Sequence, residues 1–260
     1  MNLMEIEQAT RQIWPALEQK ALPYGVLRYA QGVSRRSNSL SLFPECEARG
    51  AELIASAEAF FRDRQLDSII RVLDQKSNAS CDFQALDEML EAQSYELQAP
   101  TKIMVMDVPS IPSSQPSHSL EVIQLTDWLK IWHEFSGQNP ADFEVHLKMM
   151  SNLSNTHCFA VLKNEQREAL SCGMAVISGS GVGLSCIATA KQHRGKSSGQ
   201  ILIEGLFDWS KNQKATYAFL QVESANSSAI SLYRKLGFRE LYSYWYRVKK
   251  MNNLISRLEQ

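Results

Sequence analysis

Apolar and polar residues follow two periodic patterns along the chain. Apolar positions that recur every three or four residues predict amphipathic helices; the segments with this pattern are residues 3–20, 47–64, 83–93, 127–135, 140–150, 198–211 and 227–236. Short apolar or alternating runs bounded by turn residues predict strands; these runs are residues 24–29, 67–73, 101–106, 158–162, 169–177, 183–189, 217–222 and 240–248. Because helices and strands are mixed in both halves, the patterns predict an α/β fold class, of the α+β type with a mixed sheet.

One segment, residues 108–119, breaks both periods. It contains three prolines and five serines, which interrupt helices and strands alike. We therefore expect a linker at 108–119 between an N-terminal domain, residues 1–107, and a C-terminal domain, residues 120–260. A chain of 260 residues is long enough for two such domains.

Charge and cysteine content narrow the function classes. Lys and Arg number 27 against 28 Asp and Glu, a formal charge of -1, which argues against a dedicated nucleic-acid binder. The first residues carry Glu5 and Glu7 where a signal peptide needs a basic start, and no apolar run reaches the roughly 18–20 residues of a membrane span. The cysteines are odd in number and widely spaced, which favours reduced thiols over a zinc site. We expect a cytoplasmic protein with no metal, membrane or nucleic-acid partner.

The chemistry-bearing segment is residues 187–199, an apolar strand that runs into a glycine-containing turn and then a helix. Backbone N–H groups in such a turn, together with the positive end of the helix that begins near Ser198, can hold phosphate oxygens. Arg194 and Lys196 add positive charge at the same place. A nucleotide P-loop would need glycine at position 190, where this chain has Ala190. The alternative is a solvated strand-to-helix turn with no ligand.

A second segment, residues 220–238, has the ordered pattern Asn-x-x-Ala-x-x-Leu-Tyr-x-x-x-Gly-Phe; its members are Asn226, Ala229, Leu232, Tyr233, Gly237 and Phe238. With the first segment, it resembles the GNAT superfamily of acyl-CoA-dependent N-acyltransferases. The pyrophosphate loop of that family, Gln/Arg-x-x-Gly-x-Gly/Ala, matches Gln192, Gly195 and Ser197. The resemblance covers about residues 120–249. Ser197 stands where the family has Gly or Ala, so its hydroxyl either bonds a phosphate or crowds it.

The resemblance implies acetyl-CoA as co-substrate and a primary amine of a small molecule or peptide as acceptor. It also implies a set of cofactor-binding residues on the strand, the turn and the following helix: Ile187, Ala188, Thr189, Gln192, Arg194, Gly195, Lys196, Ser197, Ser198, Gly199 and Asn226. The pantetheine arm is expected to bond the strand through backbone groups, as an added strand would. Tyr233 occupies the position of the family's general acid, which protonates the leaving thiolate.

Each of the remaining candidates has a structural alternative. Glu223 is the best candidate for the base that deprotonates the amine, and its alternative is a surface carboxylate at a strand end. Asn226 either orients the cofactor or caps a helix, and Tyr233 is otherwise a core aromatic residue. Arg35 and Arg36 recognise a substrate carboxylate or phosphate, or else they lie in a solvated turn or an inter-domain contact.

Residues 1–107 lack a second pyrophosphate-loop motif. The run from Tyr24 to Ser39 and the later Ala57–Phe61 helix resemble the degenerate N-terminal half of two-part bacterial GNAT proteins. The leading hypothesis is thus an N-acetyltransferase, monomeric or homodimeric, in which the amine attacks the thioester directly and Cys186 is not a nucleophile. The competing hypothesis is a non-catalytic acyl-CoA-binding regulatory protein, motivated by Ser197 and by the absence of a carboxylate on residues 183–189.

Overall fold

A computed structural model describes residues 3–46, 50–74, 81–108 and 119–251, which form two compact units. Unit 1 comprises residues 1–17 and 102–241, and unit 2 comprises residues 18–101 and 242–260. The sequence predicted a division at one linker, whereas here the N-terminal segment belongs with the second half and the C-terminal segment with the first. Most of the expected linker, residues 109–118, lies outside the described residues.

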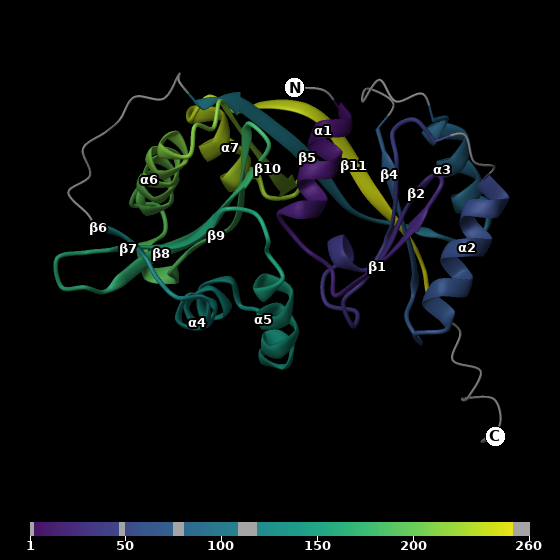
Figure 1. Cartoon of the computed structure of the whole chain (residues 1–260), viewed down its shortest axis with the longest axis horizontal. Coiled ribbons are helices and arrows are strands. Elements are labelled where there is room, and N and C mark those ends of the chain that lie inside the picture. The colour runs from purple at the N-terminus through teal and green to yellow at the C-terminus, as the bar shows by residue number, and fades with distance from the viewer. Residues whose placement is uncertain (1–2, 47–49, 75–80, 109–118, 252–260) are drawn as a thin grey trace. The chain divides into compact units, whose positions relative to one another are not determined.

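Unit 1 is built from helices packed on both faces of a sheet. Its described elements are α1 (Leu3–Gln12), β6 (Ser119–Val122), α4 (Leu125–Ser136), η4 (Pro140–Asp142), α5 (Phe143–Ser151), β7 (His157–Lys163), β8 (Ala169–Ser178), β9 (Gly181–Thr189), η5 (Lys191–His193), α6 (Ser198–Asn212), β10 (Tyr217–Glu223) and α7 (Ser227–Lys235). Figure 1 shows α6 on one face of β7, β8 and β9, with α4 on the other. Strands β6 to β9 are antiparallel neighbours, and β10 pairs with β9 in parallel.

Apolar periodicity explains why these helices lie where they do. Helix α6 buries Leu202, Ile203, Leu206 and Phe207 along one stripe, as a helix facing a sheet should. Helix α4 ends at Gly137, which adopts a left-handed conformation at φ 67°, and this is the usual glycine signal after a helix.

Helix α1 completes unit 1 from the other end of the sequence. The side chain of Gln12 shares a hydrogen bond of 2.6 Å with Ser178 at the end of β8. A side chain at Gly183 would come within 2.7 Å of Ile13, so the glycine in β9 permits the close approach of this segment. Burial of Ile6, Ile13 and Trp14 gives the N-terminal segment its place in this core.

Unit 2 has a smaller sheet covered by two helices. Its described elements are β1 (Glu18–Leu22), β2 (Gly25–Tyr29), η1 (Arg35–Ser37), β3 (Leu40–Leu42), α2 (Gly50–Arg62), β4 (Ser68–Leu73) and α3 (Phe83–Ala92). Strands β1, β2 and β3 are antiparallel, and β4 lies parallel to β3. The last strands of the two halves, β5 (Glu96–Asp107) and β11 (Arg239–Lys249), contribute residues to both units.

The two halves of the chain repeat one order of elements and exchange their last strands. In each half an antiparallel set of strands is followed by a helix, a parallel strand, a second helix and a final strand. The strand next to β4 is β11, from the second half, and the strand next to β10 is β5, from the first half. This order confirms the predicted mixed α/β fold. The N-terminal half repeats the element order of the C-terminal half, as the resemblance to two-part GNAT proteins implied.

Several predicted elements differ from the observed ones. The helix expected over residues 3–20 ends at Gln12, and Glu18–Leu22 is strand β1 instead. The helix stops early because Pro15 disfavours helical geometry at the residue before it. Strands β3 and β6 were not predicted because each is only three or four residues long. Among the described residues, no helix combines the length and the apolar character that a membrane span needs.

Candidate active site

Strands β9 and β10 part in the middle of the unit 1 sheet. They pair in parallel from Gly181 with Tyr217 to Leu184 with Leu220. Beyond that point β9 continues through residues 185–189 and β10 through residues 221–223, but these two described segments do not pair with each other. The backbone edge of β9 is therefore open toward β10 along the residues that the sequence predicted for pantetheine binding.

A bulge in β9 lies at the point where the strands part. The register between β8 and β9 shifts between Cys172 and Met174, so that Gly173 faces two residues of β9. One of them, Cys186, has a φ of 56°, a conformation rare for residues other than glycine. A bulge bends its strand and re-aims backbone groups, so this feature shapes the open edge of β9.

Helix α4 supports the bulge from below. The indole Nε1–H of Trp128 donates a 3.1 Å hydrogen bond to the backbone carbonyl of Gly173, and Trp128 is fully buried. A Cβ atom on Gly173 would lie 2.6 Å from Cδ1 of Ile187. Gly173 is therefore needed for close packing against the bulge, and its carbonyl is paired with a side chain.

The predicted anion cradle forms a turn between β9 and α6. After η5, Gly195 adopts a φ of 74° and Ser197 a φ of 62°, and Ser197 is the residue before the first turn of α6. Apart from the residues adjacent to it in the chain, no described residue has an atom within 4 Å of a Cβ placed on Gly195, so the space beside this turn is open. The first N–H groups of α6 have no partner within the helix and point out of its N-terminus, as a phosphate site requires.

The φ of Ser197 explains why small residues suit this position. A left-handed backbone strains any residue with a Cβ atom, and glycine least. The Ser197 side chain makes no capping hydrogen bond to α6 and is exposed. Serine at this position therefore carries a backbone strain that alanine would share and glycine would not.

The charged residues of the turn are anchored to different extents. Arg194 donates to the backbone carbonyl of Thr189 at 3.2 Å and to that of Phe135 at 3.4 Å. His193 bonds Glu168 at 3.1 Å, and hydrogen bonds from His193 and Asn164 lower the pKa of the Glu168 carboxyl. The side chains of Lys196 and Gln192 are exposed, and Gln192 also hydrogen-bonds the Glu168 carboxyl, which further lowers the pKa of that carboxyl. His193 therefore has a structural partner in Glu168.

The start of α6 packs between β9 and α7. A Cβ on Gly199 would lie 3.5 Å from both Thr189 and Leu232, and Ser171 donates a 3.1 Å hydrogen bond to the carbonyl of Ser198. The cradle, the end of β9 and the face of α7 that carries Leu232 are thus brought together.

Tyr233 lies on α7 in the unit 1 core. Its side chain is 7% exposed and meets Phe238 edge to face with centroids 5.8 Å apart. Burial raises the pKa of the phenol to about 12, and the hydroxyl forms no hydrogen bond with a described residue. The structure therefore places a protonated phenol with spare hydrogen-bonding capacity next to Leu232.

Asn226 and Glu223 lie in the connection between β10 and α7. The Asn226 side chain accepts a 3.1 Å hydrogen bond from the backbone N–H of Ala229, so it caps α7 as one of the two sequence hypotheses had it. Glu223 ends β10 with an exposed side chain that has no ion pair or hydrogen bond with a described residue. Its carboxylate is available at the end of the strand that parts from β9.

The sequence analysis missed the bulge and the residues that hold it. Gly173 interrupts an apolar strand, and an isolated glycine in a strand is a known signal of a bulge or a close backbone approach. No comparable signal marks Trp128, because a tryptophan on an amphipathic helix is indistinguishable from an ordinary core residue. Arg35, the other early candidate, donates to Gln98 at 2.8 and 3.1 Å on the surface of unit 2.

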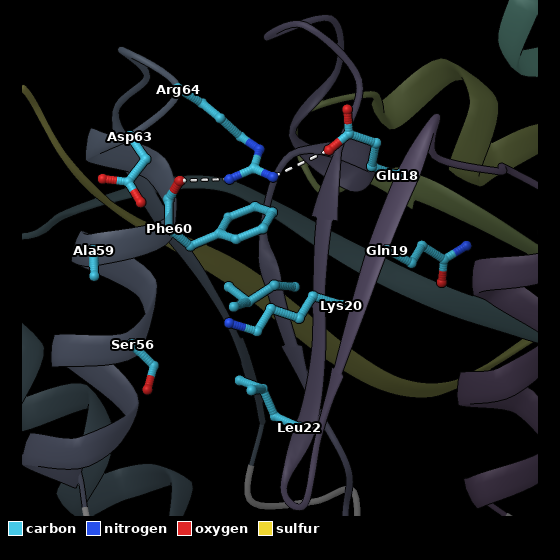
Figure 2. Close-up of a pocket in the computed structure, with 10 residues that line it drawn as sticks. Glu18, Gln19, Lys20, Leu22, Ser56, Ala59, Phe60, Asp63 and Arg64 are labelled. Carbon is cyan, nitrogen blue, oxygen red and sulfur yellow. Dashed lines mark hydrogen bonds and ion pairs between the residues drawn. The ribbon is translucent and has the colours of Figure 1, made fainter.

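A separate pocket of about 370 Å³ lies in unit 2 between β1 and α2. Figure 2 shows Arg64 at one end of it, with its guanidinium 3.8 Å from the Phe60 ring centroid and 3.1 Å from the Glu18 carboxylate. Lys20 lines the same pocket. None of the residues predicted for cofactor binding or catalysis lines this pocket. Among the described residues, no group of three or more His, Cys, Asp or Glu side chains could hold a metal ion.

Comparison with known proteins agrees with this geometry. The family described as the C-terminal part of the probable histone acetyltransferase Rv0428c matches residues 2–247. The uncharacterized N-acetyltransferase YobR of Bacillus subtilis strain 168 is 29% identical over 256 residues, 96% of this chain and 99% of that protein.

Solved structures share the fold at low sequence identity. A GCN5-related N-acetyltransferase from Kribbella flavida superimposes with a TM-score of 0.69 at 11% identity, covering 98% of this chain and 99% of that one. A tandem GNAT protein from the clavulanic acid biosynthesis pathway gives a TM-score of 0.62 at 10% identity, covering 94% and 87%. Since the family match extends over nearly the whole chain, this protein belongs to that acetyltransferase family, and it shares its fold with the GNAT structures, a tandem GNAT protein among them.

Proposed function

We propose that this protein transfers the acetyl group of acetyl-CoA to a primary amine of a small molecule or peptide, by direct attack of the amine on the thioester. The observation that carries the proposal is the parting of β9 from β10 after Leu184 and Leu220, with the Cys186 bulge at that point and the α6 cradle at the far end of the same strand. An open strand edge that leads to an anion site suits acetyl-CoA, in which the arm that carries the thioester is attached to a pyrophosphate.

The residues of the cradle fit the pyrophosphate. Open space beside Gly195 leaves room for phosphate oxygens against backbone N–H groups at the start of α6. Lys196 and Gln192 are exposed at the turn and supply side-chain donors, and Arg194 adds charge while it remains bonded to the strand end. In this proposal the backbone of Ile187, Ala188 and Thr189 holds the pantetheine arm, and Ser198 and Gly199 supply N–H donors.

Tyr233 is assigned to the leaving sulfur. With a pKa of about 12 the phenol stays protonated at neutral pH and can donate to the thiolate as it departs. A thiol with a pKa near 8.5 is the stronger acid, so complete proton transfer from Tyr233 would be uphill by about 5 kcal/mol. Tyr233 therefore stabilises the departing thiolate chiefly through a strong hydrogen bond. The proton that the amine releases as the amide forms balances the negative charge of that thiolate.

Glu223 is assigned to the amine. An alkylammonium with a pKa near 10 is not a nucleophile at neutral pH and must lose its proton. The Glu223 carboxylate lies at the end of β10, where it can accept that proton directly or through water. No disulfide joins any two of the five cysteines, all of which lie in the described part of the chain, and this is consistent with activity in the reducing cytoplasm.

A thiol-release assay on a panel of primary amines tests the proposal. The parent protein should release CoA only with a suitable acceptor, and Tyr233→Phe should lower kcat by about 10- to 100-fold, which is the loss of one strong hydrogen bond, with an unchanged Kd for acetyl-CoA. Glu223→Gln should lower kcat most at low pH. Equal turnover by the parent and Tyr233→Phe would remove the tyrosine from the reaction.

One observation favours the second candidate, a non-catalytic acyl-CoA-binding regulator. The Arg194 guanidinium occupies the carbonyl of Thr189, one of the backbone groups proposed for pantetheine, and Ser197 carries backbone strain. In that case acetyl-CoA binds but no amine in the panel gives turnover above the uncatalysed rate.

A further inference from the structure

Unit 2 contains a counterpart of the site between β9, α6 and β10. Strand β3 leads into α2, and β4 then pairs with β3 in parallel through Leu40 with Ile70 and Ser41 with Arg71. The segment before α2 therefore corresponds to the cradle of unit 1. The segment before α3, which contains Cys81, corresponds to the connection that carries Asn226.

These two segments are joined to each other in unit 2. The backbone N–H of Cys81 donates to the carbonyl of Pro44 at 3.1 Å. In unit 1 no backbone hydrogen bond links the described residues 190–197 to residues 224–226. A backbone hydrogen bond thus joins the two segments in unit 2, whereas the corresponding described segments of unit 1 have none between them.

Two thiols lie near this backbone hydrogen bond and contact each other. The thiol of Cys81 forms a hydrogen bond with that of Cys46. Cys46 is 6% exposed, and Cys81 is half-buried. Asp82, the next residue, caps α3 by accepting from the N–H of Ala85 at 3.0 Å, which fixes the backbone beside Cys81.

We propose that Cys46 and Cys81 form a peroxide-sensitive thiol pair, which peroxide oxidises to a disulfide that joins the segment before α2 to the segment before α3. Two neighbouring thiols, one of them reachable from solvent, are the arrangement that redox-responsive disulfides require. Both residues belong to unit 2, so the pair responds whether or not unit 1 transfers acetyl groups.

The two thiols share one ionisation equilibrium. The hydrogen bond with Cys46 and burial raise the pKa of Cys81 well above its ordinary value, and the charges of Cys46 and Asp82 add to this. When one sulfur of the pair carries the negative charge, the other keeps its proton and donates it.

The reaction balances with one peroxide. The thiolate of one cysteine attacks a peroxide oxygen, the O–O bond breaks, and the departing hydroxide takes up the proton that this cysteine released, giving water and a sulfenic acid. The sulfur of the other cysteine then attacks the sulfenic sulfur, an S–S bond forms, the S–O bond breaks, and the departing hydroxide takes up the proton of the attacking thiol to give a second water. The two thiols lose two electrons and two protons in total, and the peroxide gains them.

Peptide mapping of the full chain tests the pair. After treatment with hydrogen peroxide and blocking with N-ethylmaleimide, digestion without reductant should yield one cross-linked species containing Cys46 and Cys81. The free thiols should fall from five to three, since the chain has five cysteines. Dithiothreitol should restore five, and the oxidised protein should unfold at a higher temperature than the reduced one because the bridge constrains the unfolded chain.

Matched variants separate this pair from the other cysteines. Cys172→Ser should still form the bridge, whereas Cys46→Ser and Cys81→Ser should not. Because the mapping also works on the parent protein alone, a variant that fails to fold does not decide the outcome. Separate alkylation of Cys46 and Cys81 at peroxide levels that already oxidise the half-buried Cys186 would overturn the proposal, and so would a bridge between any other two cysteines.

Discussion

Substitution of Gly173 tests whether the bulge in β9 depends on close packing from β8. In Gly173→Ala the new Cβ would lie 2.6 Å from Cδ1 of Ile187 and 3.1 Å from Cδ2 of Leu202, well inside the roughly 3.5–4.0 Å of a favourable carbon contact. One of the partners must move by about 1 Å. Overpacking of this kind costs about 1–3 kcal/mol, and the loss of glycine's flexibility in the unfolded chain returns about 0.5–1 kcal/mol. We expect a net loss of about 1–2 kcal/mol.

Ile187→Val is the matched second substitution, because it deletes the Cδ1 methyl that lies nearest to the new Cβ. Alone it should cost about 0.5–1.5 kcal/mol. If the clash is as the structure places it, the double variant should be about as stable as Ile187→Val, a favourable coupling of about 1–2 kcal/mol, equal to the loss in Gly173→Ala alone. Urea denaturation of the four proteins measures this cycle. Additive losses, or a Gly173→Ala protein as stable as the parent, would refute the packing argument for the bulge.

Three further substitutions test other contacts. Trp128→Phe leaves the Gly173 carbonyl buried without its 3.1 Å donor, so it should lower the free energy of unfolding by about 2 kcal/mol more than the loss of ring area alone would. The control in urea denaturation is Trp132→Phe, because Trp132 stacks on Trp128. Asn226→Ala should destabilise by about 1 kcal/mol through loss of the α7 cap, and Asn226→Asp should restore it; an equally unstable Asp variant would contradict the cap. Burial opposes ionisation of Asp87, but hydrogen bonds from Arg247 and Trp245 outweigh it and lower the pKa of Asp87. The stabilisation is thus present above the unfolded value of about 3.9 and is lost as pH falls through the lower folded value. Asp87→Asn should cost on the order of 2 kcal/mol at pH 7, since the pair is partly exposed, and should flatten the fall in unfolding free energy below about pH 4; an unchanged acid profile would exclude this pair.

Local signals in the sequence were enough for most elements and for the cradle. Apolar periodicity located β9, α6, β10 and α7 to within a few residues, because each buries one continuous stripe or strand in a single core. The Gln192-x-x-Gly195 spacing located the turn before α6 through its resemblance to the family's pyrophosphate loop, and Gly195 there has a φ of 74°.

Non-local features could not be obtained in this way. The exchange of β5 and β11 depends on which strands pair, and period-two patterning is the same for either partner. The grouping of α1 with residues 102–241 depends on contacts such as that of Gln12 with Ser178, which are far apart in the sequence. The bulge at Cys186 needed the register of β8 against β9, and only Gly173 hinted at it.

In the proposed reaction the turn around Gly195 holds the pyrophosphate of acetyl-CoA. The most direct test is calorimetric titration of acetyl-CoA into the parent protein, Gly195→Glu and Gly179→Glu. Gly179 is the matched control, because it too has a positive φ, 58°, and no neighbour within 4 Å of an added Cβ, but it lies in the β8–β9 turn. The account predicts micromolar binding by the parent and Gly179→Glu and none by Gly195→Glu, whereas binding that survives Gly195→Glu, or a parent that does not bind, would contradict it.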